Sequence, residues 1–146
     1  MNRYMRHRAR KLLVQALYQH LVTGDDAKTL LAQFLADLNE KKVDAEYFKE
    51  LLVGCLTQKE MLEAKLQQFL EYPLAKVTLV ERAVLLIAAY ELTFNLELSY
   101  RIIIDEALEI DKTFGTAEGY RLINGILDRL AAQERASEHG AEPLSD

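Results

Sequence analysis

The residues whose chemistry is easiest to interpret are basic and lie at the start of the chain. The first 23 residues contain no acid, and the first carboxylate is Asp25. The basic residues of this segment are Arg3, Arg6, Arg8, Arg10 and Lys11. The whole chain is nevertheless acidic, with 18 Lys and Arg against 23 Asp and Glu and a net charge of -5. Positive charge at one end of an acidic chain predicts a contact with a polyanion, because cationic side chains neutralise phosphates. The alternative is a solvated basic helix start that only aids solubility.

A first helix, over about Arg6 to Val22, positions these charges. Its apolar residues fall on one broad arc at 100° per residue: Ala9, Leu12, Leu13, Ala16 and Leu17. Tyr18 falls on the opposite face near Lys11, where its ring can stack on a base or dock to a protein partner. It can also be a surface aromatic without a role, or pack on the next helix. Arg6 falls on the apolar arc, so we expect residues 1–8 to form a basic arm outside the helix.

A second cluster is predicted where one helix stops at Gly115 and another begins near Ala117. Lys112 and Arg121 flank this junction, and backbone N–H groups at a helix start attract anions. Phe114 completes an apolar stripe, which favours a core position over a contact with RNA. Glu118 suits the helix dipole but would repel a phosphate placed there.

Little in the sequence indicates an enzyme. Four acids lie within seven residues, at Asp105, Glu106, Glu109 and Asp111, but such a run is typical of a solvated helix face rather than an acid–base pair. The three histidines lack metal-ligand spacing, and no phosphate-binding glycine loop or nucleophile elbow occurs. We therefore expect no catalytic residue, no metal and no cofactor.

Composition favours a single cytoplasmic domain. A chain of 146 residues is long enough for one core, which we place in residues 1–135, with an acidic flexible tail over 136–146. The lone Cys55 lies in an apolar helical run and fits a buried thiol in a reducing compartment. No charge-free apolar run has the length of a membrane span, and no apolar segment typical of a secretory signal follows the first charges.

The apolar residues recur at spacings of three and four, which predicts an all-α fold. The helix starts are marked by predicted capping residues: Asp25 or Asp26, Asp44, Thr78 and Ser99. The third predicted helix, which follows Asp44, is long enough that we expect a break at Thr57–Gln58. The helix after Thr78 is apolar nearly all round and is expected to be buried. After the first, the helices are predicted to run from Asp25 or Asp26 through Leu38, from Ala45 to Tyr72, from Thr78 through Leu92, from Ser99 to Phe114, and from Ala117 to Gln133.

Taken together, these motifs resemble the NusB family of bacterial transcription antitermination factors. The similarity covers about Arg6 to Asp128 in family order. The matching segments are Val14-Gln15-Ala16-Leu17-Tyr18, Tyr47-Phe48 with Leu51-Leu52, Val80 to Leu85 with Tyr90-Glu91-Leu92, Asp105 to Gly115, and Ile123-Asn124-Gly125-Ile126-Leu127-Asp128. The resemblance implies about seven helices in two packed three-helix sub-bundles.

The resemblance also implies a function. Members bind boxA-type single-stranded RNA of ribosomal RNA leaders together with NusE, a ribosomal small-subunit protein. The complex joins the elongating RNA polymerase and suppresses premature termination. By position, Arg6, Arg8, Arg10 and the Phe114 to Arg121 region correspond to RNA contacts. Tyr18, Glu81 and Arg82 correspond to partner-surface residues, and a homodimer is a further possibility. For Glu81 the partner role competes with a capping-box role beside Thr78, and one carboxylate can serve both.

Several positions depart from the family pattern. Leu122 stands where an aromatic residue is frequent, Asp105 where an Asn is common and Asp111 where a small residue is usual. Asp111 and Glu118 imply weaker RNA binding without a partner. The main alternative is therefore a helical protein–protein interaction module with weak or lost RNA specificity. A third hypothesis is that the chain resembles the front part of ribosomal RNA cytosine methyltransferases, which would require a further domain that binds the cofactor.

Overall fold

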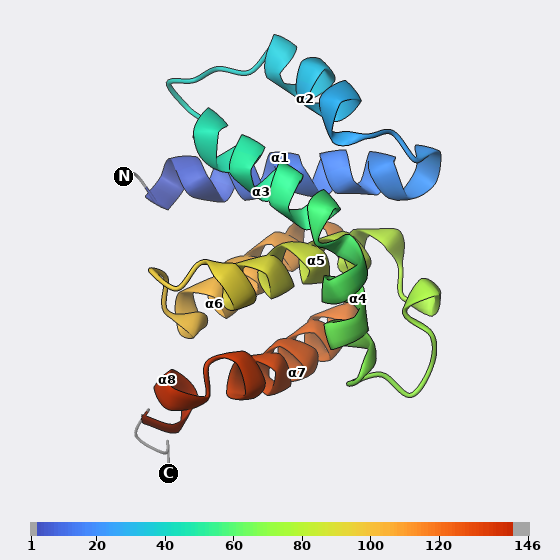
Figure 1. The fold of residues 1–146 in the computed structure, drawn as a ribbon, viewed down its shortest axis with the longest axis vertical. Coiled ribbons are helices and arrows are strands. Elements are labelled where there is room, and N and C mark those ends of the chain that lie inside the picture. The colour runs from blue at the N-terminus through green and yellow to red at the C-terminus, as the bar shows by residue number, and fades with distance from the viewer. Residues whose placement is uncertain (1–2, 142–146) are drawn as a thin grey trace. The chain divides into compact units, whose positions relative to one another are not determined.

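The computed structural model describes residues 3–141, and these form helices and no strand, as predicted (Figure 1). The described helices are α1 (Arg3–Thr23), α2 (Ala27–Ala36), α3 (Ala45–Thr57), α4 (Lys59–Gln67), the short 3₁₀ helix η1 (Leu74–Lys76), α5 (Leu79–Phe94), α6 (Tyr100–Phe114), α7 (Ala117–Glu134) and α8 (Ala136–Ala141). The chain divides into two compact units between Lys59 and Glu60. The first unit holds α1 to α3, and the second holds α5 to α7 together with α4, η1 and α8.

In the first unit, α1 packs against both α3 and α2. Its core is built from fully buried side chains: Leu13, Leu17, Leu30, Phe48 and Leu52. The predicted caps are present, because Asp26 accepts from the Thr29 N–H at 2.9 Å and Asp44 from the Tyr47 N–H at 3.0 Å. The predicted break is also confirmed, since α3 ends at Thr57 with Gln58 as its C-cap.

In the second unit, α5 packs against both α6 and α7, which also pack against each other. Ten residues of α5 are buried: Glu81, Ala83, Val84, Leu85, Leu86, Ile87, Ala88, Ala89, Glu91 and Leu92. A helix with so little polar surface must be covered on several sides. The predicted burial of this helix is confirmed, and it fixes where α6 and α7 lie.

The segment after Glu134 differs from the predicted tail, because residues 136–141 form α8. Arg135 precedes it and is buried, donating to the backbone oxygens of Leu92 and Asn95 at 2.8 Å each. Its guanidinium thereby satisfies carbonyls at the end of α5, which have no partner inside that helix. Arg135 also donates to Glu138 at 2.8 Å, and Glu138 accepts from the Tyr100 N–H at 2.9 Å. Residues 142–146 of the predicted tail lie outside the described residues.

Two further expectations concern single features. Cys55 is a buried thiol that forms no disulfide with another described residue, as its apolar surroundings in the sequence predict. Among residues 3–141, none of the helices combines the length and the apolar character that a membrane crossing requires.

Candidate nucleic-acid interface

The basic residues at the start of the chain belong to a helix rather than to an arm. Helix α1 begins at Arg3, so Arg3, Arg6 and Arg8 are all helical, and residues 1–2 lie outside the described part. Arg3 is exposed, whereas Arg8 and Lys11 are half-buried. The Arg8 guanidinium lies over the exposed ring of Tyr4, with its carbon 4.3 Å from the ring centroid. The exposed cations of this end are therefore held on a rigid element.

Arg6 and Arg10 point inward, which corrects the prediction that both present free guanidinium groups to RNA. Arg6 Nε lies 3.7 Å from Asp44 Oδ2, and its guanidinium carbon is 4.1 Å from the Tyr47 ring centroid. Arg10 is only 2% exposed and donates to the Tyr47 hydroxyl at 3.3 Å. Arg10 precedes the buried Leu13 by three residues, so helix periodicity itself directs it to the core face.

Tyr18 is exposed, as predicted, with 42% of its surface accessible. Val22, one turn further along α1, is also exposed, and residues four apart lie on the same helix face. The two side chains form a small apolar area on α1. The role of Tyr18 as a partner contact stays a prediction.

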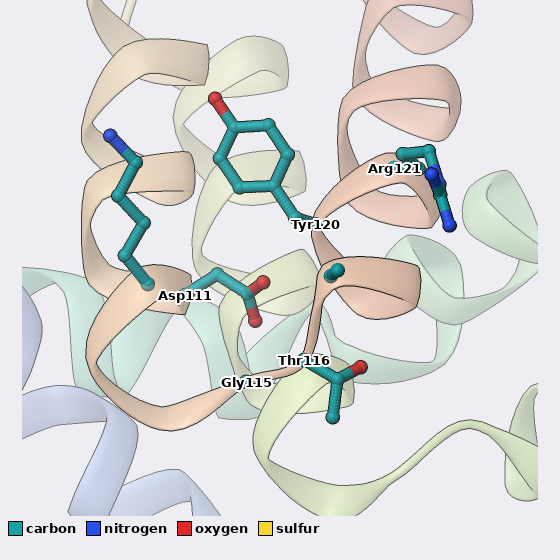
Figure 2. Close-up of a pocket in the computed structure, with 7 residues that line it drawn as sticks. Asp111, Gly115, Thr116, Tyr120 and Arg121 are labelled. Atoms are coloured by element: carbon teal, nitrogen blue, oxygen red, sulfur yellow. The ribbon is translucent and has the colours of Figure 1, made fainter.

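The second predicted cluster forms a pocket in the second unit, at the turn between α6 and α7 (Figure 2). Its volume is about 410 Å³. The lining residues are Asp111, Lys112, Gly115, Thr116, Ala117, Tyr120 and Arg121. Thr116 caps α7 by accepting from the Gly119 N–H at 3.0 Å. Lys112 and Arg121 both line this pocket, and the Lys112 ammonium lies 6.0 Å from the Tyr120 ring centroid.

Phe114 directly precedes Gly115 of this pocket in the chain and is 41% exposed, so the core position that its apolar stripe favoured is wrong. It is the last residue of α6, and the chain leaves the helix at Gly115. At this end of α6 the neighbouring helices no longer cover the apolar face of the helix, so the Phe114 ring is left exposed. Exposure leaves Phe114 available to a ligand, as the family resemblance implies.

Asp111 does not belong to a solvated face, because 0% of its surface is exposed. Glu106 is likewise buried, so the predicted acidic face consists only of Asp105 and Glu109. Neither Asp111 oxygen has a hydrogen-bond partner. A Cβ at Gly115 would overlap this carboxylate, and the Gly115 φ of -107° is one that any residue adopts. A side chain at Gly115 would therefore require the Asp111 carboxylate to move, although the backbone conformation there suits any residue.

Glu81 is a second buried acid near the same turn, which corrects its prediction as a partner-surface residue. It is 6% exposed, and one carboxylate oxygen accepts from the Thr78 hydroxyl at 2.8 Å. The other oxygen, Oε2, has no partner, and a Cβ at Gly119 would overlap it. Burial raises the pKa of Asp111 to about 6, and the negative charge of Glu81 adds to the shift.

Arg82, the third predicted partner residue, is half-buried and engaged within its own unit. Its Nε and Nη2 donate to Glu63 Oε2 at 3.1 and 2.6 Å. A guanidinium held in this way is a positioned surface group rather than a mobile one. Within residues 3–141, no group of three or more His, Cys, Asp or Glu side chains is arranged to hold a metal ion.

Comparison with known proteins decides the family, since the NusB family profile matches residues 7–132. The chain belongs to the NusB family. The transcription antitermination protein NusB of Shewanella amazonensis is 41% identical over 128 residues, which are 88% of this chain and 96% of that protein. The protein of the same name from Paraburkholderia phymatum is 43% identical over 133 residues, 91% of this chain and 92% of that one.

Solved NusB structures share the fold. T. maritima NusB superposes with a TM-score of 0.80 at 30% identity, covering 92% of this chain and 95% of that one. A structure of antitermination factors NusB and NusE with double-stranded RNA gives a TM-score of 0.78 at 22% identity, covering 91% and 99%. The all-α NusB-like fold inferred from the sequence is confirmed.

The different positions of Arg8 and Arg10 in this NusB-family chain predict different effects on stability. Arg10→Met removes the buried guanidinium and its hydrogen bond to Tyr47, which should cost about 1–3 kcal/mol. Arg8→Met changes a partly exposed residue and should stay within about 0.5 kcal/mol of the parent chain. Urea unfolding followed by circular dichroism measures both. Equal midpoints for the two variants would contradict the inward position of Arg10.

The raised pKa of Asp111 predicts that the folding stability of the chain falls as pH rises. A carboxyl whose pKa rises on folding binds its proton more tightly in the folded chain, so stability falls as pH rises from about 4 through about 6. Asp111→Asn removes this titration and should stabilise the chain by roughly 1–3 kcal/mol at pH 7.5, with the gain shrinking toward pH 4.5. The exposed Asp105→Asn on the same helix is the control. A gain independent of pH would show that the Asp111 carboxylate does not carry the effect.

Proposed function

We propose that this chain is a transcription antitermination factor that binds boxA-type single-stranded RNA together with NusE and joins the elongating RNA polymerase in the cytoplasm. Relatives named transcription antitermination protein are 41–43% identical across most of the chain, which supports the assignment. The observation that carries it is the pocket at the turn from α6 to α7, which Lys112, Tyr120 and Arg121 line.

The chemistry of this pocket suits a strand with splayed bases. Lys112 and Arg121 are exposed and can neutralise phosphates, and Tyr120 offers an aromatic wall. A volume of about 410 Å³ lies in the range of small-molecule pockets and can receive one base. Phe114, exposed beside it, adds a further surface for stacking.

The first unit offers a separate cationic surface. Arg3 is exposed, and Arg8 and Lys11 follow along α1. The exposed Tyr4 ring beneath the Arg8 guanidinium combines an aromatic face with a positive charge, as in single-strand binding sites. Arg3, Arg8 and Lys11 therefore remain proposed phosphate contacts, whereas Arg6 and Arg10 face Asp44 and Tyr47 within the first unit.

The pocket also explains a need for a partner. Asp111 and Glu118 place negative charge close to any phosphate held by Lys112 or Arg121, so the isolated chain should bind RNA weakly. A second RNA-binding subunit such as NusE enlarges the contact and raises the effective concentration of the strand. Tyr18 and Val22 are the proposed docking residues, because they are exposed apolar side chains on one face of α1.

Arg121→Glu should reduce the affinity for boxA-type RNA at least about tenfold and lower the log–log salt slope by about 1, because one phosphate contact is lost. Fluorescence anisotropy with NusE present, at 50 and 200 mM salt, measures both quantities. Arg129→Glu makes the same charge change at another exposed position of α7 and should leave affinity nearly unchanged. Equal binding of boxA-type and scrambled RNA by the parent chain would instead favour the protein–protein module.

Tyr18→Asp should weaken the complex with NusE about tenfold or more, because aromatic residues dominate interface energies and the new carboxylate would be buried. It should not alter thermal unfolding, since the ring is exposed. Calorimetric titration of NusE measures the affinity. Tyr72→Asp is a matched control, because Tyr72 is 43% exposed. Unchanged affinity of the Tyr18 variant would refute this docking surface.

A further inference from the structure

The Asp111 carboxylate at the pocket of α6 and α7 has no partner, although it is buried. Figure 2 shows it pointing from α6 toward the start of α7, between Tyr120 and Thr116 in this view. Both oxygens lack a hydrogen bond, and leaving a buried charged acceptor unsatisfied is costly. Such a group is a candidate acceptor for a ligand that brings its own N–H donors.

The charges around the pocket restrict what that ligand can be. The exposed Lys112 and Arg121 disfavour a simple cation and favour a molecule that carries negative charge outside the pocket. The carboxylate inside requires hydrogen-bond donors on the inserted part. A nucleotide has this distribution, because its phosphate is anionic and its base edge is polar and uncharged.

Among the bases, guanine fits a carboxylate best. Its Watson–Crick edge presents two adjacent donors, N1–H and the N2 amino group, which match the two carboxylate oxygens. Adenine and cytosine each place one amino group beside an acceptor, and uracil places its single N–H between two acceptors. Acceptors facing a carboxylate repel it, so the other three bases are disfavoured.

We propose that the pocket between α6 and α7 binds the base of a guanine nucleotide, with Asp111 accepting from its Watson–Crick edge and Lys112 and Arg121 facing its phosphates. The inference rests on the proposed function, because the guanine is taken to belong to the bound RNA. The Asp111 oxygens are shielded in the structure, so binding includes a shift of the Gly115–Thr116 turn that borders them. Most Asp111 side chains are ionised at neutral pH, as acceptance of two donors requires.

The test changes one chemical group of guanine at a time. Anisotropy with NusE present compares boxA-type RNA with copies in which each guanosine is replaced by inosine, which lacks the N2 amino group, or by 7-deazaguanosine, which keeps the edge. At one position we expect inosine to weaken binding by roughly tenfold and 7-deazaguanosine to have little effect. Asp111→Asn should abolish this discrimination, whereas Asp105→Asn should retain it.

The outcomes separate the inference from the function on which it rests. Equal affinity for guanosine and inosine RNA at every position, together with rejection of scrambled RNA, overturns the inference and leaves the function standing. Failure to bind any of the RNAs would refute the function itself. Guanosine monophosphate is added as a second arm, with the Gly115 and Gly119 amide resonances as the readout. If the free nucleotide shifts these resonances and RNA binding shows no discrimination, the pocket binds a free guanine nucleotide, and the part of the inference that assigns the guanine to the bound RNA is overturned.

Discussion

The burial of α5 is the constraint on which the second unit depends. Residues from Ala83 to Leu92 leave almost no polar face, and each fully buried aliphatic side chain contributes roughly 1.5–3 kcal/mol. Because α6 and α7 both pack against this helix and against each other, the short turn between them has little freedom. The turn places the end of α6, with Asp111, beside the first turn of α7, with Tyr120. The same packing offsets the cost of burying Asp111 and Glu81.

Most of the fold could be predicted because it follows from local patterns. A spacing of three and four identifies helices, and Asp44, Thr78 and Ser99 each cap a helix where the sequence predicts one. Helix α8 could not be predicted, since its position depends on Arg135 reaching carbonyls of α5 about forty residues earlier. A long cationic side chain carries no local signal that its partners are backbone oxygens.

The candidate site could be predicted only in part, because the contacts of a long or buried side chain leave no local signal in the sequence. Lys112 and Arg121 lie nine residues apart across a predicted helix junction, so their proximity followed from the sequence. A helical wheel gives the direction of a side chain but not what it meets. Arg6 falls on the apolar arc, which suggested that it lay outside the helix. In the structure Arg6 is helical, and its guanidinium lies near the Asp44 carboxylate and over the Tyr47 ring. Glu81 escaped prediction because the glycine beside it, Gly119, belongs to α7. Gly115 lies only one turn after Asp111, but spacing alone does not show that the carboxylate is buried beside it.

A buried acid in a pocket that Lys112 and Arg121 also line has opposite effects on affinity and on selectivity. Its charge lowers the attraction for every phosphate by a similar amount, whatever the base sequence. Its oxygens, in contrast, interact favourably only with a base that supplies donors, and in a shielded pocket this difference is larger than in water. Asp111 therefore exchanges part of the general electrostatic attraction for discrimination between bases. Such an exchange is tolerable when a partner subunit restores the lost affinity, because the partner contributes binding energy without altering which base the pocket accepts.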